Sequence, residues 1–358
     1  MVFLDWAKAF DRMKSDTLLI ALTRFGLPEE FVDMIGGIYK VRKFFIADHS
    51  GKSDVYAQNA GIAQGCPLSP FLFILVQSVM FHDIYNLLHL DPEPPFVVTR
   101  EVLYADDTLL MSSSPQNLQA LLNAVVAEGA KYGLELHWGK TYQMQVCTAA
   151  SICKPNGEMI VSKREVVYLG SIISCDGKSE REVSRRIGEG RTVFKVLSKL
   201  WRHANLTVHR KLQIFNACVL TKVLYALESL WLLKVEQRRL DAFQCYCLRQ
   251  IMRIAPSFVS RISNVTVFER SHQTPLTALL KQRQIRCYKI VQASGQDDFV
   301  KQLVCNNHGV PINWYIHRKR GRPRQKWATS VFRLMSDPIV DPLVPFVPFF
   351  HPAADTWW

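Results

Sequence analysis

The spacing of hydrophobic and polar positions changes character near residue 177. Before that point, short apolar runs alternate with segments of helical period, which predicts strands and helices in one α+β domain. From 179 to 295, apolar residues recur three and four positions apart, which predicts a mainly helical region. The elements expected before the change are a strand over 1–7, helices over 16–40 with a break at 26–28, a hairpin over 44–58, a helix over 70–88, two strands over 97–111, a helix over 115–132 and short strands to 174.

These patterns predict four segments. The first, 1–177, is the α+β domain, and the second, 178–300, is a helical domain. A basic segment follows over 301–336. The end of the chain, 337–358, begins with five prolines in fifteen residues from Pro338 and is expected to be an irregular tail.

Composition narrows the class of protein. Of the 358 residues, 48% are hydrophobic, enough for one large core or two modest ones. The net charge of +13 favours a polyanionic partner such as nucleic acid, although a solvated basic surface explains it equally well. Nine cysteines without a CxxC pair argue against a zinc finger and predict reduced, mostly buried thiols. We expect no signal peptide, because the N-terminus has no basic start and an acid stands at position five. We expect no membrane partner, because the apolar run 68–80 is short, and we place the protein inside the cell, in nucleus or cytoplasm.

Three acidic residues stand where strands end. Asp5 follows the apolar run Val2–Leu4, and Asp106 and Asp107 lie in a tight turn between two apolar strands. Clustered carboxylates repel one another unless cations neutralise them, and oxygen ligands favour Mg²⁺ or Mn²⁺. Two such ions, about 3.5–4 Å apart, can activate a hydroxyl and stabilise a leaving pyrophosphate. The alternative is that each aspartate only caps a turn.

Five motifs, in order, surround these acids. They are Phe3-Leu-Asp-Trp-Ala-Lys-Ala-Phe-Asp11, Gly61-Ile-Ala-Gln-Gly-Cys-Pro-Leu-Ser-Pro70, Tyr104-Ala-Asp-Asp107, Gly133-Leu-Glu-Leu-His-Trp-Gly-Lys-Thr141 and Tyr168-Leu-Gly170. Together they resemble the palm motifs of reverse transcriptases, in the wording of the non-LTR (LINE-type) retrotransposon branch. The resemblance implies a right-hand polymerase palm, an antiparallel sheet with packed helices, followed by a helical thumb.

The resemblance also implies roles. Asp5 and Asp106 would be the main ligands of two Mg²⁺ (or Mn²⁺) ions, with Asp107 in support, and Phe10 would exclude a ribose 2′-hydroxyl. Gln64, Gly65 and Lys140 would contact the incoming nucleotide. The primer and template would meet Tyr104, Tyr168, Leu169 and Gly170. The implied activity is an RNA-directed DNA polymerase whose partners are an RNA template, a DNA primer and deoxynucleoside triphosphates.

A dense basic run lies toward the end of the chain. Its cations are Arg318, Lys319, Arg320, Arg322, Arg324 and Lys326. We rank general nucleic-acid contact first, nuclear targeting second and an AT-hook around Arg320–Pro323 third. Trp314 and Trp327 flank the run and could stack on bases or anchor a helix in a core.

The sequence departs from the family pattern in several places. The fingers that precede the first motif are missing, Ala63 stands where a basic residue is common, and His137 stands where the family often has Asn. These departures suggest a truncated retroelement copy or a gene model that begins too late, and no endonuclease domain is visible. Two further hypotheses stay open: a catalytically inactive nucleic-acid-binding remnant, and a helical scaffold built on 179–295.

Overall fold

The computed structural model describes residues 1–40, 42–49, 51–58, 60–90, 92–93, 99–203, 205–312 and 326–335. The chain divides into two compact units, 1–176 and 177–358. This division falls where the change in hydrophobic pattern places the domain boundary. The names palm and thumb for the two units remain predictions, and each unit is described by itself below.

A four-stranded antiparallel sheet forms the centre of the first unit. Its strand order is β6-β7-β1-β8, so the first strand of the chain lies inside the sheet. The strands are β1 (Val2–Asp5), β6 (Glu101–Tyr104), β7 (Asp107–Leu110) and β8 (Tyr142–Gln143). With the helices below, this makes the unit α+β, as predicted. The start of the strand pair predicted over 97–111 lies partly outside the described residues.

Alternate residues of β1 face two different layers. Val2 and Leu4 pack in a large core with helices, whereas Phe3 packs with Leu109 in a separate core. The helices on the first face are α1 (Ala9–Arg12), α2 (Ser15–Phe25), α3 (Glu29–Lys40), α4 (Ser69–Leu87) and α5 (Pro115–Lys131). The second face is covered by the hairpin of β9 (Glu165–Tyr168) and β10 (Ser171–Ser174), whose Val166 and Tyr168 join Phe3.

Two glycines end helices where the sequence predicts stops. Gly26 has φ 96° and separates α2 from α3. Gly133, after α5, has φ 81°, and a Cβ there would lie 2.6 Å from the Arg12 carbonyl oxygen. Both positions need a left-handed backbone that glycine adopts without strain. The predicted helix break and helix end are therefore confirmed.

Helix α4 is longer than the apolar run that predicted it. By length and composition alone its 19 residues could cross a membrane, with a mean hydropathy of 1.2. The helix predicted over 70–88 is confirmed, and the expectation of no membrane partner stays a prediction. However, Leu72, Phe73, Val76 and Met80 are fully buried in the first unit. This burial is what a core helix requires.

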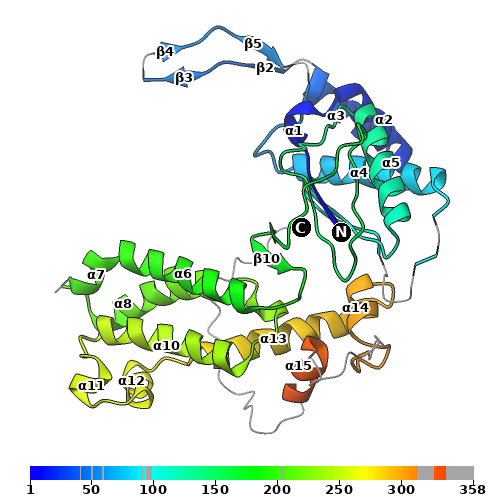
Figure 1. Cartoon of the computed structure of the whole chain (residues 1–358). Helices are drawn as coiled ribbons and strands as arrows, with labels where there is room; N and C mark the ends of the chain where they lie inside the picture. Colours follow the sequence, from blue (N-terminus) through cyan, green and yellow to red (C-terminus); the bar gives the residue numbers. More distant parts are fainter. Residues whose placement is uncertain are drawn as a thin grey trace. The chain divides into compact units, whose positions relative to one another are not determined.

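A narrow hairpin arm, which we define as residues 42–58, extends from the helices of the first unit (Figure 1). At its base β2 (Arg42–Phe44) pairs with β5 (Tyr56–Gln58), and at its tip β3 (Ala47–Asp48) pairs with β4 (Gly51–Lys52). The hairpin predicted over 44–58 is confirmed. Phe44, Phe45 and Tyr56 are each about half exposed along the arm.

The second unit is helical, as predicted. Its elements are α6 (Glu180–Val196), α7 (Ser198–Arg202), α8 (Val208–Phe215), the π-helix η1 (Asn216–Leu220), α9 (Thr221–Leu224), the 3₁₀-helix η2 (Leu227–Ser229), α10 (Lys234–Ile251), α11 (Ser257–Ser260), α12 (Asn264–Ser271), α13 (Leu276–Ala293), α14 (Phe299–Val304) and α15 (Trp327–Met335). Helices α6, α10 and α13 contribute to one core with the α8–α9 region. Gly190 permits the close approach of α6 to α9, because a Cβ at this position would lie 2.3 Å from Val223 Cγ2 of α9.

The C-terminal residues answer part of the sequence hypotheses. Trp327 Nε1 donates to the Glu228 carbonyl at 2.7 Å, and its ring lies 6.0 Å from that of Tyr288. Trp327 is therefore a core anchor. Trp314, the basic run from Arg318 to Arg324 and the predicted tail lie outside the described residues. The cysteines differ from expectation: all are free, but only Cys245, Cys247 and Cys305 are buried.

Candidate active site

The sheet sets the acidic residues opposite one another. In the antiparallel pairing of β1 and β7, Asp5 lies directly across from Asp107, and Phe3 lies across from Leu109. Directly paired residues share a face, so Asp5 and Asp107 project on the face that carries the β9–β10 hairpin. Tyr104 pairs with Asp107 on the other side and closes the turn that holds Ala105 (φ 50°) and Asp106. The site therefore depends on contacts between residues about a hundred positions apart.

The carboxylates repel one another in this arrangement. The pKa of Asp107 is raised, first by burial and then by the charges of Asp106 and Asp5. A cation lies near only part of the group: Lys140 Nζ is 3.8 Å from Asp5 Oδ2, and its side chain is 63% exposed. A contact this long and this exposed offsets little of the repulsion. The negative charge is therefore largely uncompensated by the described residues.

A pocket of about 450 Å³ lies beside these acids. It brings together five of the residues singled out in the sequence, from four separate motifs: Asp5, Phe10, Gln64, Asp106 and Lys140. Asp107, Gly65, Tyr104 and Tyr168 do not line it. These five residues bring two acids, an aromatic ring, an amide and a cation to the pocket, and Trp6, Lys8, Arg12 and His137 also line it. This combination can hold a charged ligand with an apolar part.

The Phe10 ring is fixed by its neighbour. It stacks on the fully buried ring of Phe73, with centroids 5.0 Å apart and planes inclined by 25°. Because Phe73 belongs to the core helix α4, the position of Phe10 is tied to the core of the unit. A ring held this way can act as a rigid wall of the pocket.

The loop of the second motif is bound to the first. Gln64 Nε2 donates to Asp11 Oδ1 at 3.0 Å, and the Ile62 amide donates to the Phe10 carbonyl at 2.6 Å. At Gly61 (φ 91°) a Cβ would lie 2.7 Å from the Asp11 carbonyl oxygen, so a side chain would not fit. Gly65 has φ 81° but open space around it. Glycine is favoured at position 65 because of its left-handed backbone conformation, since a Cβ there would meet no neighbouring atom.

The β9–β10 hairpin turns at Leu169 (φ 47°) and Gly170 (φ 71°). Tyr168 meets Phe3 edge to face, with ring centroids 5.6 Å apart, and its hydroxyl lies 3.5 Å from the Val102 carbonyl. Burial, and then the charge of Asp107, raise the pKa of Tyr168 to about 12. This hairpin is therefore fastened to the strand that bears Asp5.

Sequence reasoning missed several residues that support the site. The His137 amide donates to the Asp5 carbonyl at 2.7 Å, and the Trp6 indole donates to Thr108 Oγ1 at 3.2 Å in a buried position. Arg12 lines the pocket and is paired with Glu135. The alternation of basic and acidic residues within the first motif could have drawn attention to Arg12. The hydrogen bonds of His137 and Trp6 depend on how distant strands align, so no local sequence pattern predicts them.

The donor atoms of the site suit a hard cation. In the described part of the chain, no group of three or more His, Cys, Asp or Glu side chains is arranged to hold a metal ion. The pocket offers the carboxylates of Asp5 and Asp106 instead, with Asp107 across the sheet from Asp5. Oxygen-only ligands that repel one another fit Mg²⁺ or Mn²⁺ better than a soft metal.

The basic run contributes little to the described structure. Lys326 is exposed just before α15, and the other predicted nucleic-acid contacts from Arg318 to Arg324 lie outside the described residues. Their role stays a prediction.

Sequence similarity identifies the class of the first unit. Residues 1–173 match the family described as "Reverse transcriptase (RNA-dependent DNA polymerase)", which covers almost all of that unit. The first unit therefore belongs to the reverse transcriptase family. Beyond this family match, the chain is similar to proteins of non-LTR retrotransposons.

Two curated relatives illustrate this. The chain is 27% identical over 197 residues to the retrovirus-related Pol polyprotein of the type-2 retrotransposable element R2DM of Drosophila melanogaster, a match of 52% of this chain and 18% of that protein. It is 26% identical over 239 residues to the RNA-directed DNA polymerase of the mobile element jockey of Drosophila funebris, a match of 63% of this chain and 25% of that protein. The chain thus spans a quarter or less of these relatives.

Among solved structures, apo telomerase from Candida tropicalis is similar over 84% of this chain and 47% of its own, at 14% identity. The TM-score is 0.38, which is below the level that indicates a shared overall fold.

Proposed function

We propose that this chain provides the palm and thumb of an RNA-directed DNA polymerase, which transfers deoxynucleotides to a primer 3′-hydroxyl on an RNA template. The observation that carries the proposal is the meeting of four separate motifs at one pocket, which Asp5 and Asp106 line together. The family match supports the same activity. In this assignment the first unit is the palm and the second is the thumb.

The acids would hold the metal ions. Asp5 and Asp106 are the proposed ligands, and Asp107 supports them from across the sheet. Two bound divalent ions would supply activation of the primer hydroxyl and neutralisation of the leaving pyrophosphate. The pKa of Asp107 is raised first by burial and then by the charges of Asp106 and Asp5. The second of these causes is a repulsion that bound cations would relieve, which supports this assignment.

The other pocket residues would position the nucleotide. Phe10, fixed against Phe73, would lie under the sugar and leave no room for a 2′-hydroxyl. Gln64 and Gly65 would contact the base and template, and Lys140 would meet the departing phosphates. Tyr104 and the turn Tyr168–Gly170 would hold the primer end. The cations of the basic run would contact the nucleic-acid backbone.

Primer extension tests the proposal. A labelled DNA primer on an RNA template, with deoxynucleotides and Mg²⁺, should be extended by the wild type. Asp106→Asn keeps the shape but removes a charged ligand, so the rate should fall roughly 10³-fold or more, equivalent to several kcal/mol of lost transition-state stabilisation. The matched control is Asp33→Asn, an exposed acid on α3, which should extend like the wild type.

Equal extension by Asp106→Asn and the wild type would refute the polymerase site. Template binding without extension in every variant would instead support the non-catalytic alternative, whose binding should weaken steeply with salt.

A further inference from the structure

The hairpin arm carries three aromatic side chains that are about half exposed among the described residues of the first unit. Phe44 is 46% exposed, Phe45 50% and Tyr56 50%. Phe44 and Tyr56 are direct cross-strand partners, with ring centroids 5.8 Å apart, so they form one continuous aromatic surface on one face of the ribbon. Three rings exposed within a ribbon this short point to a binding surface.

Cations accompany the rings. Lys52 Nζ lies 5.0 Å from the centroid of Phe45, and Lys43 is exposed beside Phe44. Over 42–58 the sequence has three basic and two acidic residues, so the arm carries a net charge of +1. This mixture of rings and ammonium groups suits a partner that has both flat apolar faces and negative charge.

The foot of the arm is fixed beside the candidate active site. Arg42 Nη1 donates to the Gly61 carbonyl at 3.2 Å, and its guanidinium lies over the ring of Tyr39 at 5.0 Å. Gly61 begins the loop that carries Gln64, a residue of the pocket wall. The rings therefore lie on a ribbon whose base is tied to that loop.

We propose that the hairpin arm is a binding surface for single-stranded nucleic acid, with bases stacked on Phe44, Phe45 and Tyr56 and phosphates paired with Lys43 and Lys52. A single strand fits because its bases have free faces, whereas the bases of a duplex are already stacked on one another. The positive charge of the arm favours this partner over a polypeptide. The proposal goes beyond polymerase activity, because the arm would bind a strand whether or not the site is catalytic.

The test measures binding of the full chain to a fluorescent oligouridylate of about 12 nucleotides, within the range that one stacking site covers. The buffer contains EDTA and no nucleotide, so failure of the polymerase assignment cannot affect the result. A leucine variant (Phe44→Leu, Phe45→Leu, Tyr56→Leu) keeps the apolar bulk and removes the rings. Affinity should fall roughly a hundredfold or more, since each of the three lost stacks is worth roughly fivefold or more. Binding of a matched RNA duplex should not change.

Two further variants separate stacking from charge. Lys43→Gln with Lys52→Gln should make the slope of log affinity against log salt shallower by roughly 1.4, because two phosphate contacts are lost on a single strand. The leucine variant should keep the wild-type slope. Phe258→Ala is the matched control, since Phe258 is an aromatic 74% exposed on α11 of the second unit, and it should bind like the wild type.

Photocrosslinking locates the strand directly. An oligonucleotide with 4-thiouridine should crosslink to peptides from 42–58 in the wild type and lose those crosslinks in the leucine variant. Wild-type affinity in the leucine variant, or no crosslink in 42–58 at saturating oligonucleotide, would overturn the proposal. The exposed rings would then be assigned to a polypeptide partner. An equal loss of duplex and single-strand binding would also overturn it, because stacking would not be the cause.

Discussion

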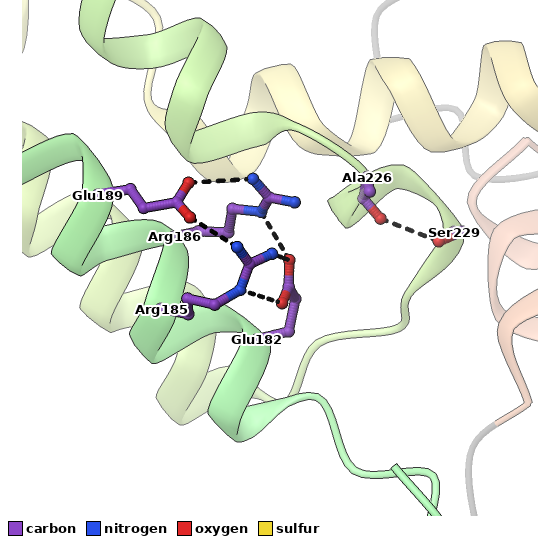
Figure 2. A network of polar contacts seen from close by, with 6 residues as sticks. All are labelled: Glu182, Arg185, Arg186, Glu189, Ala226 and Ser229. Carbon is purple, nitrogen blue, oxygen red and sulfur yellow. Dashed lines mark hydrogen bonds and ion pairs between the residues drawn. The ribbon is translucent and has the colours of Figure 1, made fainter. Parts of the chain in front are cut away.

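Two regions of this molecule concentrate charge in opposite ways. At the edge of the sheet in the first unit, Asp5, Asp106 and Asp107 gather, and the nearest cation, Lys140, makes one exposed contact of 3.8 Å. On helix α6 of the second unit, Glu182 and Glu189 meet Arg185 and Arg186 in a closed network (Figure 2). The first region leaves like charges together, whereas in the second both Glu182 and Glu189 are paired with arginines.

The α6 network follows from helical spacing. Its members lie three or four positions apart, and Glu182 accepts from Arg186 Nε at 2.6 Å and from Arg185 Nη2 at 2.7 Å. Glu182 and Arg186 are almost fully buried, so these bonds satisfy charges that water does not reach. The bonds to Glu182, and then the charges of Glu182 and Glu189, raise the pKa of Arg185.

The difference separates two uses of charge. Charges paired within the fold stabilise the fold, whereas acids left without a partner at a pocket are available to a ligand that brings the opposite charge. Substitutions in the two regions should therefore affect different measurements: stability in the network, and activity at the sheet edge.

The largest effect is expected from breaking the network. Arg186→Ala removes one of the two arginines that bond the buried carboxylate of Glu182, while Arg185 stays bonded to it. The cost should be roughly 1–3 kcal/mol in the free energy of unfolding of the second unit. Urea denaturation followed by hydrogen exchange of α6 peptides measures this loss. Lys195→Ala, an exposed position on the same helix, is the control and should change stability by less than about 0.5 kcal/mol.

Replacing both partners is the informative companion. Glu182→Leu with Arg186→Met removes the buried charges together and should recover most of the lost stability. If Arg186→Ala left α6 as stable as Lys195→Ala does, the network would contribute no more to the stability of the fold than the acids at the sheet edge do. The comparison would then fail.

The two regions also differ in how far the sequence predicts them. The α6 pairs are local, so helical spacing alone suggests them, just as it predicts the helix break at Gly26. The pairing of Asp5 with Asp107 joins residues 102 positions apart. The apolar strands and the Tyr-Ala-Asp-Asp turn predict that the acidic residues lie at strand ends. Only the resemblance to a family predicts that Asp5 lies beside Asp106 and Asp107, because strand register is set by the whole sheet. The hydrogen bond from the His137 amide to Asp5 depends on that register and was missed.

A smaller effect is expected from Lys140, the cation that contacts Asp5 at the sheet edge. Lys140→Gln should leave the stability of the first unit within about 0.5 kcal/mol, because an exposed ion pair contributes little. Extension should slow by roughly a hundredfold, the lower end of what a proton donor contributes. Rates at saturating nucleotide and hydrogen exchange of β1 peptides measure the two quantities. A loss of stability without a loss of rate would assign Lys140 to the fold instead of the reaction.

The smallest effect tests the unpaired acids themselves. Asp107 and Asp5 are like charges directly opposite each other on neighbouring strands, an arrangement that costs roughly 0.2–1 kcal/mol. Asp107→Asn should therefore stabilise the first unit by about that amount at neutral pH, measured by hydrogen exchange of β1 and β7 peptides.

The pH dependence has a definite sign. The pKa of Asp107 is raised in the folded state above its ordinary value of 3.8, so the folded chain takes up the proton first as pH falls. Wild-type stability should then rise relative to Asp107→Asn as pH falls through the folded pKa, and the gap should close near the unfolded value. Mg²⁺ at neutral pH should close the same gap, since a bound cation relieves the same repulsion. If protonation narrows the gap and Mg²⁺ does not, the acids repel one another without forming a metal site, and the difference between the two regions would be one of stability alone.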